Sequence, residues 1–316
     1  MNQKSKGHYL ILYDIRKTSD NTAYTLRANA LALRDIAFGN VVYARNVICH
    51  LEIDMDDKNN LILPWLPENL ELLNKQEEEN RRESILRINA DSKLREHLDI
   101  IYASLNMLFD LTISYENQTD DELTIQYLGI RLFNSIVSSL KLLLAGYYQN
   151  SVILQRDILE TGFLLDFFSI DQSKILDWKK SNNKERYNKY KPSSIRKALD
   201  DRDGFKGRKR EQIYQRMCEY GAHPTYPGIK LVAPEGLAKI GPFFDAKYLR
   251  SLIGELAMRV PLFTLIYLMH FKKLPSGFLK VQADFLDKLK TWSQKYFNLD
   301  LSYVDINCIK EWVELL

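Results

Sequence analysis

Cysteine is scarce in this sequence, which has only Cys49, Cys218 and Cys308 among its 316 residues. An odd number of scattered cysteines predicts neither a disulfide framework nor a zinc site, and it is typical of a protein in a reducing compartment. The sequence also lacks a Walker loop, a GxGxxG pattern, an HExxH pair and paired CxxC motifs. These absences argue against the common nucleoside triphosphatases, Rossmann enzymes and zinc hydrolases. We therefore expect no cofactor and no bound metal ion.

Long apolar runs and a secretory leader are also missing. The first residues, MNQKSKGHYLILYDI, lack the long apolar core and the cleavage site of a signal peptide. The most apolar stretch, from about Val260 to Phe271, is too short to span a bilayer and contains Pro261. We expect a cytoplasmic protein that makes no contact with a membrane.

Net charge is small, at +3, but it is unevenly distributed. The segment 172–216 holds fifteen Lys and Arg residues against six Asp and Glu residues, so the rest of the chain is net acidic. Such asymmetry favours an anionic partner for the middle of the chain, and the alternative is a solvated polar segment between apolar helices.

The first part of the chain has the pattern of a small α/β unit. Residues 8–15 are rich in β-branched and aromatic side chains, and a helical period follows over residues 19–38. Apolar and polar residues then alternate from Cys49 to Met55, and Leu61 to Leu63 form a second short apolar run after a polar turn. We predict a β-α-β-β region with a charged linker over residues 1–80.

The remainder, residues 81–316, has a helical pattern almost throughout. Apolar residues recur every three or four positions in several segments, such as Leu94 to Leu108 and Ile125 to Tyr147. Asp120 or Asp121 is expected to cap the second of these helices, and Asp245 to start a long helix near the C-terminal end. Between them, residues 171–207 form a basic, broken segment. The predicted fold class is mainly α, with a C-terminal multi-helix bundle behind the small α/β region.

The predicted helix at residues 151–170 is apolar almost all round, which is typical of a buried helix. It nevertheless carries Arg156, Asp157 and Glu160. Charges are too costly to bury unpaired, so these side chains pair, meet water or face a site. An Arg156–Glu160 pair that locks neighbouring helices and a functional role for these residues both fit the pattern.

A second candidate site lies at the end of the helix expected from about Arg208 to Tyr220. Arg216 and His223 are seven residues apart, nearly two helical turns, and so fall near one face. Pro224 disfavours a helical conformation at His223, which places the imidazole at a frayed end or in a loop. A fixed cation beside a group that titrates near neutral pH can handle a phosphate. The alternative is a surface arginine and a loop-capping histidine.

Aromatic residues are interleaved with the basic ones in this part of the chain. Such rings can stack on unpaired bases of a nucleic acid. They are Trp178, Tyr187, Tyr190, Phe205, Tyr214, Tyr220 and Tyr226.

The Arg216-x6-His223 pattern, late in a set of amphipathic helices, resembles the Arg-x(4–6)-His motif of the HEPN superfamily. That resemblance covers at most residues 120–271. It implies a helical bundle, a metal-independent ribonuclease of antiphage defence or a toxin–antitoxin system, and an active site where two bundles meet. Arg216 and His223 would be catalytic, and Glu160 would be a supporting acid.

On this hypothesis His223 takes the proton of a ribose 2′-hydroxyl or delivers one to the leaving oxygen, while Arg216 stabilises the transition-state charge. Neighbouring RNA contacts are expected from Arg156, Lys206, Arg208, Lys209, Arg210 and Tyr220. The expected partners are RNA, a second copy of the chain, and a cognate antitoxin or defence-system protein. The rival hypothesis is a non-enzymatic helical module that docks a partner protein.

Overall fold

The computed structural model describes residues 68–271, 274, 276–301 and 306–316. Contacts between Cα atoms divide the chain into two units, Met1–Pro64 and Trp65–Leu316. The strands and helix predicted between residues 8 and 63 lie outside the described residues. Within the described residues the chain is mainly helical and contains no β-strand, as predicted for the larger part.

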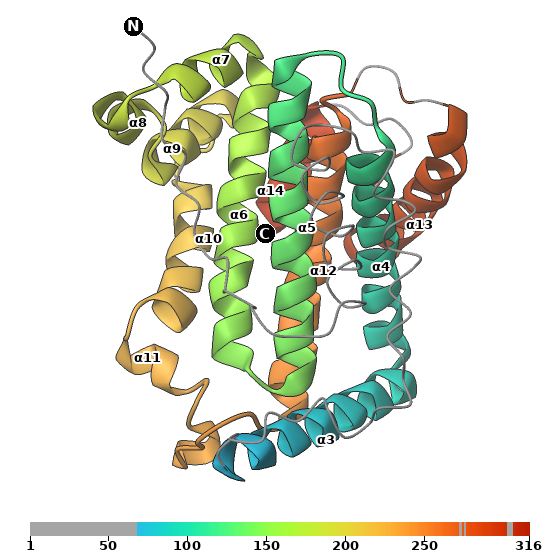
Figure 1. Cartoon of the computed structure of the whole chain (residues 1–316), viewed down its shortest axis with the longest axis vertical. Helices are drawn as coiled ribbons and strands as arrows, with labels where there is room; N and C mark the ends of the chain where they lie inside the picture. Colours follow the sequence, from blue (N-terminus) through green and yellow to red (C-terminus); the bar gives the residue numbers. More distant parts are fainter. Residues whose placement is uncertain (1–67, 272–273, 275, 302–305) are drawn as a thin grey trace, which may run out of the picture. The chain divides into compact units, whose positions relative to one another are not determined.

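Long helices form the core of the second unit (Figure 1), where α4, α5, α6 and α12 run alongside one another. Their apolar faces meet because buried residues recur at helical spacing along each of them. The long helices are α3 (Glu68–Ala90), α4 (Ser92–Ser114), α5 (Asp120–Ala145), α6 (Tyr148–Ile170), α12 (Ala246–Leu268) and α13 (Leu279–Phe297).

Polar caps fix where several of these helices begin. Asp245 caps α12 as predicted, its carboxylate accepting from the backbone N–H groups of Lys247 and Tyr248. The cap of α5 is Thr119, whose hydroxyl accepts from Glu122 N at 3.1 Å, and not the predicted Asp120 or Asp121. Those two aspartates lie instead in the first turn of α5, where negative charge favours the helix dipole.

Helix α12 packs closely against α5 and α6 at one glycine in each of these helices. A Cβ at Gly162 of α6 would overlap the ring of Phe263, and a Cβ at Gly129 of α5 would overlap the ring of Tyr267. Phe263 and Tyr267 are completely buried. The missing side chains therefore let two large aromatic rings pack directly against neighbouring backbones.

Helix α3 packs with the bundle. Asn80 Nδ2 donates to Ala145 O at 3.1 Å, Ser84 Oγ donates to Leu144 O at 3.0 Å, and Tyr147 Oη donates to Glu77 at 2.7 Å. All three bonds join α3 to the end of α5 and the turn that follows it. The helix begins at Glu68, within the segment 1–80 for which the sequence predicts the N-terminal region and its linker.

Short helices fill the basic segment after α6 and the stretch that follows it, along one side of α6 in Figure 1. They are α7 (Ser173–Lys180), α8 (Asn183–Lys189), α9 (Pro192–Asp203), α10 (Lys209–Met217) and α11 (Tyr226–Ile229). The helix expected up to Tyr220 changes character after Met217. A π-helical turn, Cys218–Ala222, follows, and His223 N closes it by donating to Cys218 O at 3.0 Å.

The C-terminal part closes the bundle with α13 and α14 (Ile306–Leu315). Trp312 of α14 is completely buried, and its ring centroid lies 6.2 Å from that of Trp292 in α13. Two of the core helices, α5 and α12, are long and apolar enough to cross a membrane by length and composition alone. In α12, 78% of the apolar window is buried inside the bundle, as a core helix requires.

Candidate functional site

Arg216 and His223 are both on the surface, on either side of the π-helical turn. Arg216 lies in the last turn of α10, and its Nη2 donates to the backbone carbonyl oxygen of Leu316 at 2.8 Å. Among the described residues, no hydrogen bond or ion pair reaches the imidazole of His223. The two side chains are therefore accessible, but they do not form a bonded pair within one chain.

Arg156 and Glu160 pair with each other in α6, with 3.5 Å between Nε and Oε1. Both side chains are half-buried, with about a quarter of each exposed (29% and 26%). The guanidinium of Arg156 also lies 5.8 Å from the centroid of the Tyr214 ring. Burial, followed by Cys218 and Glu160, raises the pKa of Tyr214 above its usual range, so its hydroxyl stays neutral. Glu160 is thus oriented toward α10 and does not contact His223 by any hydrogen bond or ion pair.

Arg210 faces the core and does not share the surface of the neighbouring basic residues. Its guanidinium is completely buried and bonds three carboxylates, at 2.5 Å to Asp203, 3.0 Å to Asp200 and 3.4 Å to Asp166. Arg202 shares two of these partners. In this arrangement Arg210 is unavailable to a phosphate, contrary to the contact expected from the sequence.

The two arginines hold the buried carboxylate of Asp203 ionised. Burial alone would raise the pKa of Asp203, but Arg202 and Arg210 outweigh it and lower that pKa below its usual value. The cluster joins α6, α9 and the start of α10, so it fixes the backbone that carries the basic segment.

Lys206 and Arg208 line a cavity of about 580 Å³ between α9 and the start of α10, hereafter the basic cavity. The cations around it are Lys191, Arg196, Lys197, Lys206 and Arg208, and the anions are Asp200, Asp201 and Glu211.

Two of the three anions of the basic cavity are neutralised inside the protein. Arg210 binds Asp200, and Arg196 binds Glu211 with 2.7 Å between Nη2 and Oε2. Lysine and arginine side chains therefore outnumber the remaining acid, Asp201, and the cavity attracts anions.

The backbone around the basic cavity has one feature that suits an anion and one that is strained. Helix α9 begins there with Pro192, and its N-cap residue, Lys191, makes no side-chain cap, which leaves the positive end of the helix dipole open to the cavity. Arg208 has φ 51° and ψ 53°, in the left-handed region that non-glycine residues adopt at a cost. The chain is thus held in a sparsely populated conformation at one of the cationic side chains.

Arg196 separates the basic cavity from a second one. That cavity, of about 270 Å³, lies between α5, α6 and the short helices, and we name it the aromatic cavity after Phe163, Trp178 and Tyr190 in its lining. Arg196 lines both cavities, and its Cζ lies 3.8 Å from the centroid of the Tyr214 ring. Its Nη1 is buried and has no hydrogen-bond partner within the described part of the chain.

The sequence did not identify Arg196 as a candidate site residue. The signal that could have indicated its burial was its position next to Ile195, which is also buried in this short helix. Of the other predicted contacts, Lys209 is half-buried in the first turn of α10, and Tyr220 is 37% exposed in the π-helical turn. Neither is among the residues that line the two cavities.

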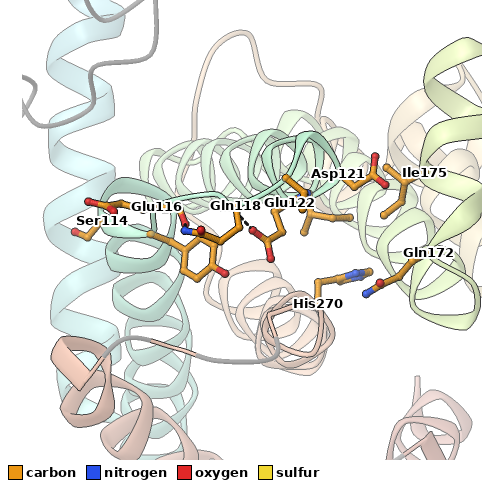
Figure 2. A pocket seen from close by; sticks show the side chains of 11 residues that line it. Ser114, Glu116, Gln118, Asp121, Glu122, Gln172, Ile175 and His270 are labelled. Atoms are coloured by element: carbon orange, nitrogen blue, oxygen red, sulfur yellow. Dashed lines mark hydrogen bonds between the residues drawn. The ribbon is translucent and has the colours of Figure 1, made fainter.

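A larger cavity, of about 850 Å³, has the opposite charge and lies at the α4–α5 and α6–α7 connections (Figure 2). Glu116, Asp121 and Glu122 line it, and the side chains of His270 and Gln172 point toward one another at its edge. Burial lowers the pKa of His270, so this imidazole is neutral and offers no charge to an anion. Three carboxylates make this cavity unsuitable for a polyphosphate, in contrast to the basic cavity.

The described residues thus form a helical bundle with a basic cavity beside an aromatic one. No protein-family model, curated protein or solved structure matches the chain. Within the part of the chain that the structure describes, no group of three or more His, Cys, Asp and Glu residues is placed to hold a metal ion.

Proposed function

We propose that this protein is a cytoplasmic RNA-binding effector, with HEPN-like metal-independent cleavage by Arg216 and His223, that serves bacterial antiphage defence or a toxin–antitoxin system. The observation that carries the RNA-binding part is the charge of the basic cavity. Lys206 and Arg208 line it together with further cations, while Arg196 and Arg210 neutralise two of its three acids.

A phosphodiester chain is the anion that fits these features best. Several separate cations spread along a cavity can contact successive phosphates, and the start of α9 adds the positive end of its helix dipole. Aromatic side chains lie directly beyond Arg196, where an unpaired base can stack. A single-stranded RNA offers both kinds of group at the spacing of one nucleotide.

Cleavage requires a base, an acid and a stabiliser of negative charge. His223 is accessible, so its imidazole can take the proton of the 2′-hydroxyl or donate one to the departing 5′-oxygen. The guanidinium of Arg216 gives one of its five N–H donors to Leu316 and has others for the non-bridging oxygens in the transition state. A 2′-hydroxyl nucleophile restricts the reaction to RNA and does not require a metal.

A second copy of the chain would complete this site on the HEPN-like hypothesis. Arg216 and His223 are both exposed and unbonded to each other, so a partner bundle can approach them from outside. We therefore propose a homodimer in which residues of two protomers surround the same phosphate.

A non-enzymatic docking module is the second candidate function. Large apolar side chains are exposed on α4 and α5, with Tyr102, Phe109 and Ile130 each between 39% and 46% exposed. Tyr102 and Phe109 are seven residues apart and so lie near one face of α4, and exposed apolar side chains on one face are typical of a protein contact. A cognate antitoxin or another defence-system protein would be the partner on this alternative.

RNA cleavage in the presence of EDTA tests the catalytic part. Wild type, Arg216→Ala and His223→Ala are incubated with tRNA and total RNA, and activity lost in both variants supports the nuclease. RNA binding is measured in parallel for Lys206→Ala/Arg208→Ala, with Lys141→Ala/Lys280→Ala as a control that removes the same charge from exposed helix positions elsewhere. A wild type that neither cuts nor binds RNA would favour the docking module.

A further inference from the structure

The aromatic cavity has the dimensions and lining of a site for one flat ring system. Three aromatic rings, those of Phe163, Trp178 and Tyr190, contribute to its wall. The other lining residues are four aliphatic ones and five charged or polar ones: Leu128, Leu164, Pro192, Ile195, Arg131, Asp157, Glu160, Thr161 and Arg196. Its volume of about 270 Å³ is near the lower end of the range for small-molecule pockets, which is about 300 Å³. The cavity therefore suits a group of one or two fused rings.

Two polar groups at this cavity are not fully used by the protein. Glu160 has the 3.5 Å ion pair with Arg156 and a contact with the Tyr214 hydroxyl, which leave part of its acceptor capacity unused. Arg196 has a buried Nη1 without a hydrogen-bond partner among the described residues. The neighbouring carboxylate, that of Asp157, is by contrast occupied by Arg131 and by Ser135 Oγ at 2.6 Å. Glu160 and Arg196 both line the aromatic cavity, so one residue with acceptor capacity and one with donor capacity to spare belong to its wall.

We propose that the aromatic cavity binds one unpaired guanine of the RNA whose phosphates occupy the basic cavity, an inference that rests on the proposed RNA binding. Guanine presents two adjacent N–H donors, which a carboxylate accepts side by side, and an oxygen acceptor that suits a guanidinium. Adenine presents an acceptor nitrogen where guanine has its ring N–H, so it places an acceptor against Glu160.

The position of Arg196 explains how one RNA segment reaches both cavities. Pro192 and Ile195 on α9 line the aromatic cavity, while Ser193, Ser194 and Lys197 on the same helix line the basic one. Arg196 lines both, so it lies where a nucleotide's base and its phosphates diverge. Its contacts with Glu211 and Tyr214 hold the guanidinium in place before any ligand arrives.

Binding of short single-stranded RNAs tests this inference. The probes are oligouridylates that carry one internal guanosine or one internal adenosine, titrated into wild type, Glu160→Gln and Trp178→Ala. Wild type is expected to bind the guanosine probe at least about tenfold more tightly, since a hydrogen bond to a charged group contributes about this factor. Glu160→Gln, which keeps the side chain's shape, is expected to lose most of that preference, and Trp178→Ala to weaken both probes.

Glu83→Gln is the matched control, because Glu83 is exposed on α3, outside both cavities, and loses the same charge. Its guanosine preference should equal that of wild type. Equal affinity of wild type for both probes, or an unchanged preference in Glu160→Gln, would overturn the guanine site. If both probes bind equally and Lys206→Ala/Arg208→Ala weakens them, the phosphate site stands and only the base site fails. If wild type binds neither probe, the proposed RNA binding itself is wrong.

Discussion

Arg210 Nη1 donates to Asp200 Oδ1 at 3.0 Å, and this buried bond joins the core of the bundle to the wall of the basic cavity. Asp200 lines that cavity, so its charge would oppose an anion if it were not paired. Arg210 therefore contributes to the positive character of the cavity from inside the protein, without reaching the ligand.

Removal of this buried arginine is expected to destabilise the fold. Arg210→Ala leaves Asp166 and Asp203 with Arg202 alone and removes the ion pair of Asp200, and breaking a buried ion network costs about 3–5 kcal/mol. Chemical denaturation measures the loss. Lys209→Ala, one residue earlier and half-buried without an ion pair, should change the free energy of unfolding by less than about 0.5 kcal/mol. Equal effects of the two substitutions would contradict the assignment of Arg210 to the core.

A substitution of Arg208 can separate an effect on the free energy of unfolding from an effect on RNA affinity. Arg208→Gly relieves the left-handed backbone at φ 51°, and the greater freedom of glycine in the unfolded chain offsets part of that gain. The free energy of unfolding should stay unchanged or rise by up to about 1 kcal/mol. RNA affinity should nevertheless fall, because the cation is lost from the basic cavity. Parallel denaturation and binding titrations measure both, and an affinity equal to that of wild type would exclude Arg208 from the RNA contact.

Close packing at Gly162 predicts a steric effect in the core. A methyl group in Gly162→Ala meets the ring of Phe263 in α12, and overpacking of this kind costs about 1–3 kcal/mol. Gly254→Ala in α12 is the control, since a Cβ there meets nothing within 4 Å. It should stabilise the protein by up to about 1 kcal/mol through helix propensity. Thermal denaturation of both variants tests whether α12 and α6 touch at this glycine.

His97 makes the stability depend on pH. Trp292 Nε1 donates to His97 Nδ1 at 3.0 Å, so the bond requires a neutral imidazole, and burial lowers the pKa of His97 to about 4. The unfolded chain takes up this proton near its ordinary pKa of about 6.5, so stability is complete above that pH and falls as the pH drops toward 4. The loss attributable to His97 between about pH 6.5 and about pH 5 is up to about 2 kcal/mol.

Denaturation of wild type and His97→Gln at several pH values measures this contribution. The variant cannot titrate at this position, so its stability should decline less over the same interval. His270, also buried with a lowered pKa, contributes in the same direction in both proteins and cancels in the comparison. Identical pH dependence of the two proteins would show that His97 is not held neutral.

The apolar periodicity predicted the helices of the bundle. It did not predict which charged side chains are buried, which residue caps α5 or where α10 becomes π-helical. Apolar spacing located α4, α5 and α12 because those helices bury a regular face. The run from Lys206 to Arg210 gave no sign of which cation turns inward, since that depends on carboxylates brought from α6 and α9 by the fold. The cap at Thr119 and the π-helical turn before His223 likewise depend on backbone geometry that spacing does not encode.

The candidate site was predictable only where it is local in sequence. Lys206 and Arg208 stood out as neighbours in a basic run, and the structure places both at one cavity. Arg196 could not be recognised in the same way, because a single arginine in a short helix belongs to no sequence motif. Its significance comes from Glu211 and Tyr214, which reach it from the next helix. The catalytic roles of Arg216, His223 and Glu160 stay predictions.

The salt dependence of RNA affinity tests the central claim, phosphate binding in the basic cavity, most directly. Affinity of a single-stranded RNA is measured over a range of salt concentrations for wild type and Lys206→Ala/Arg208→Ala. Each phosphate contact contributes about 0.7 to the slope of log affinity against log salt, so the double variant should bind more weakly with a slope shallower by about 1.4. Lys141→Ala/Lys280→Ala should keep the slope of wild type. Equal slopes in wild type and Lys206→Ala/Arg208→Ala would contradict phosphate binding by these two residues.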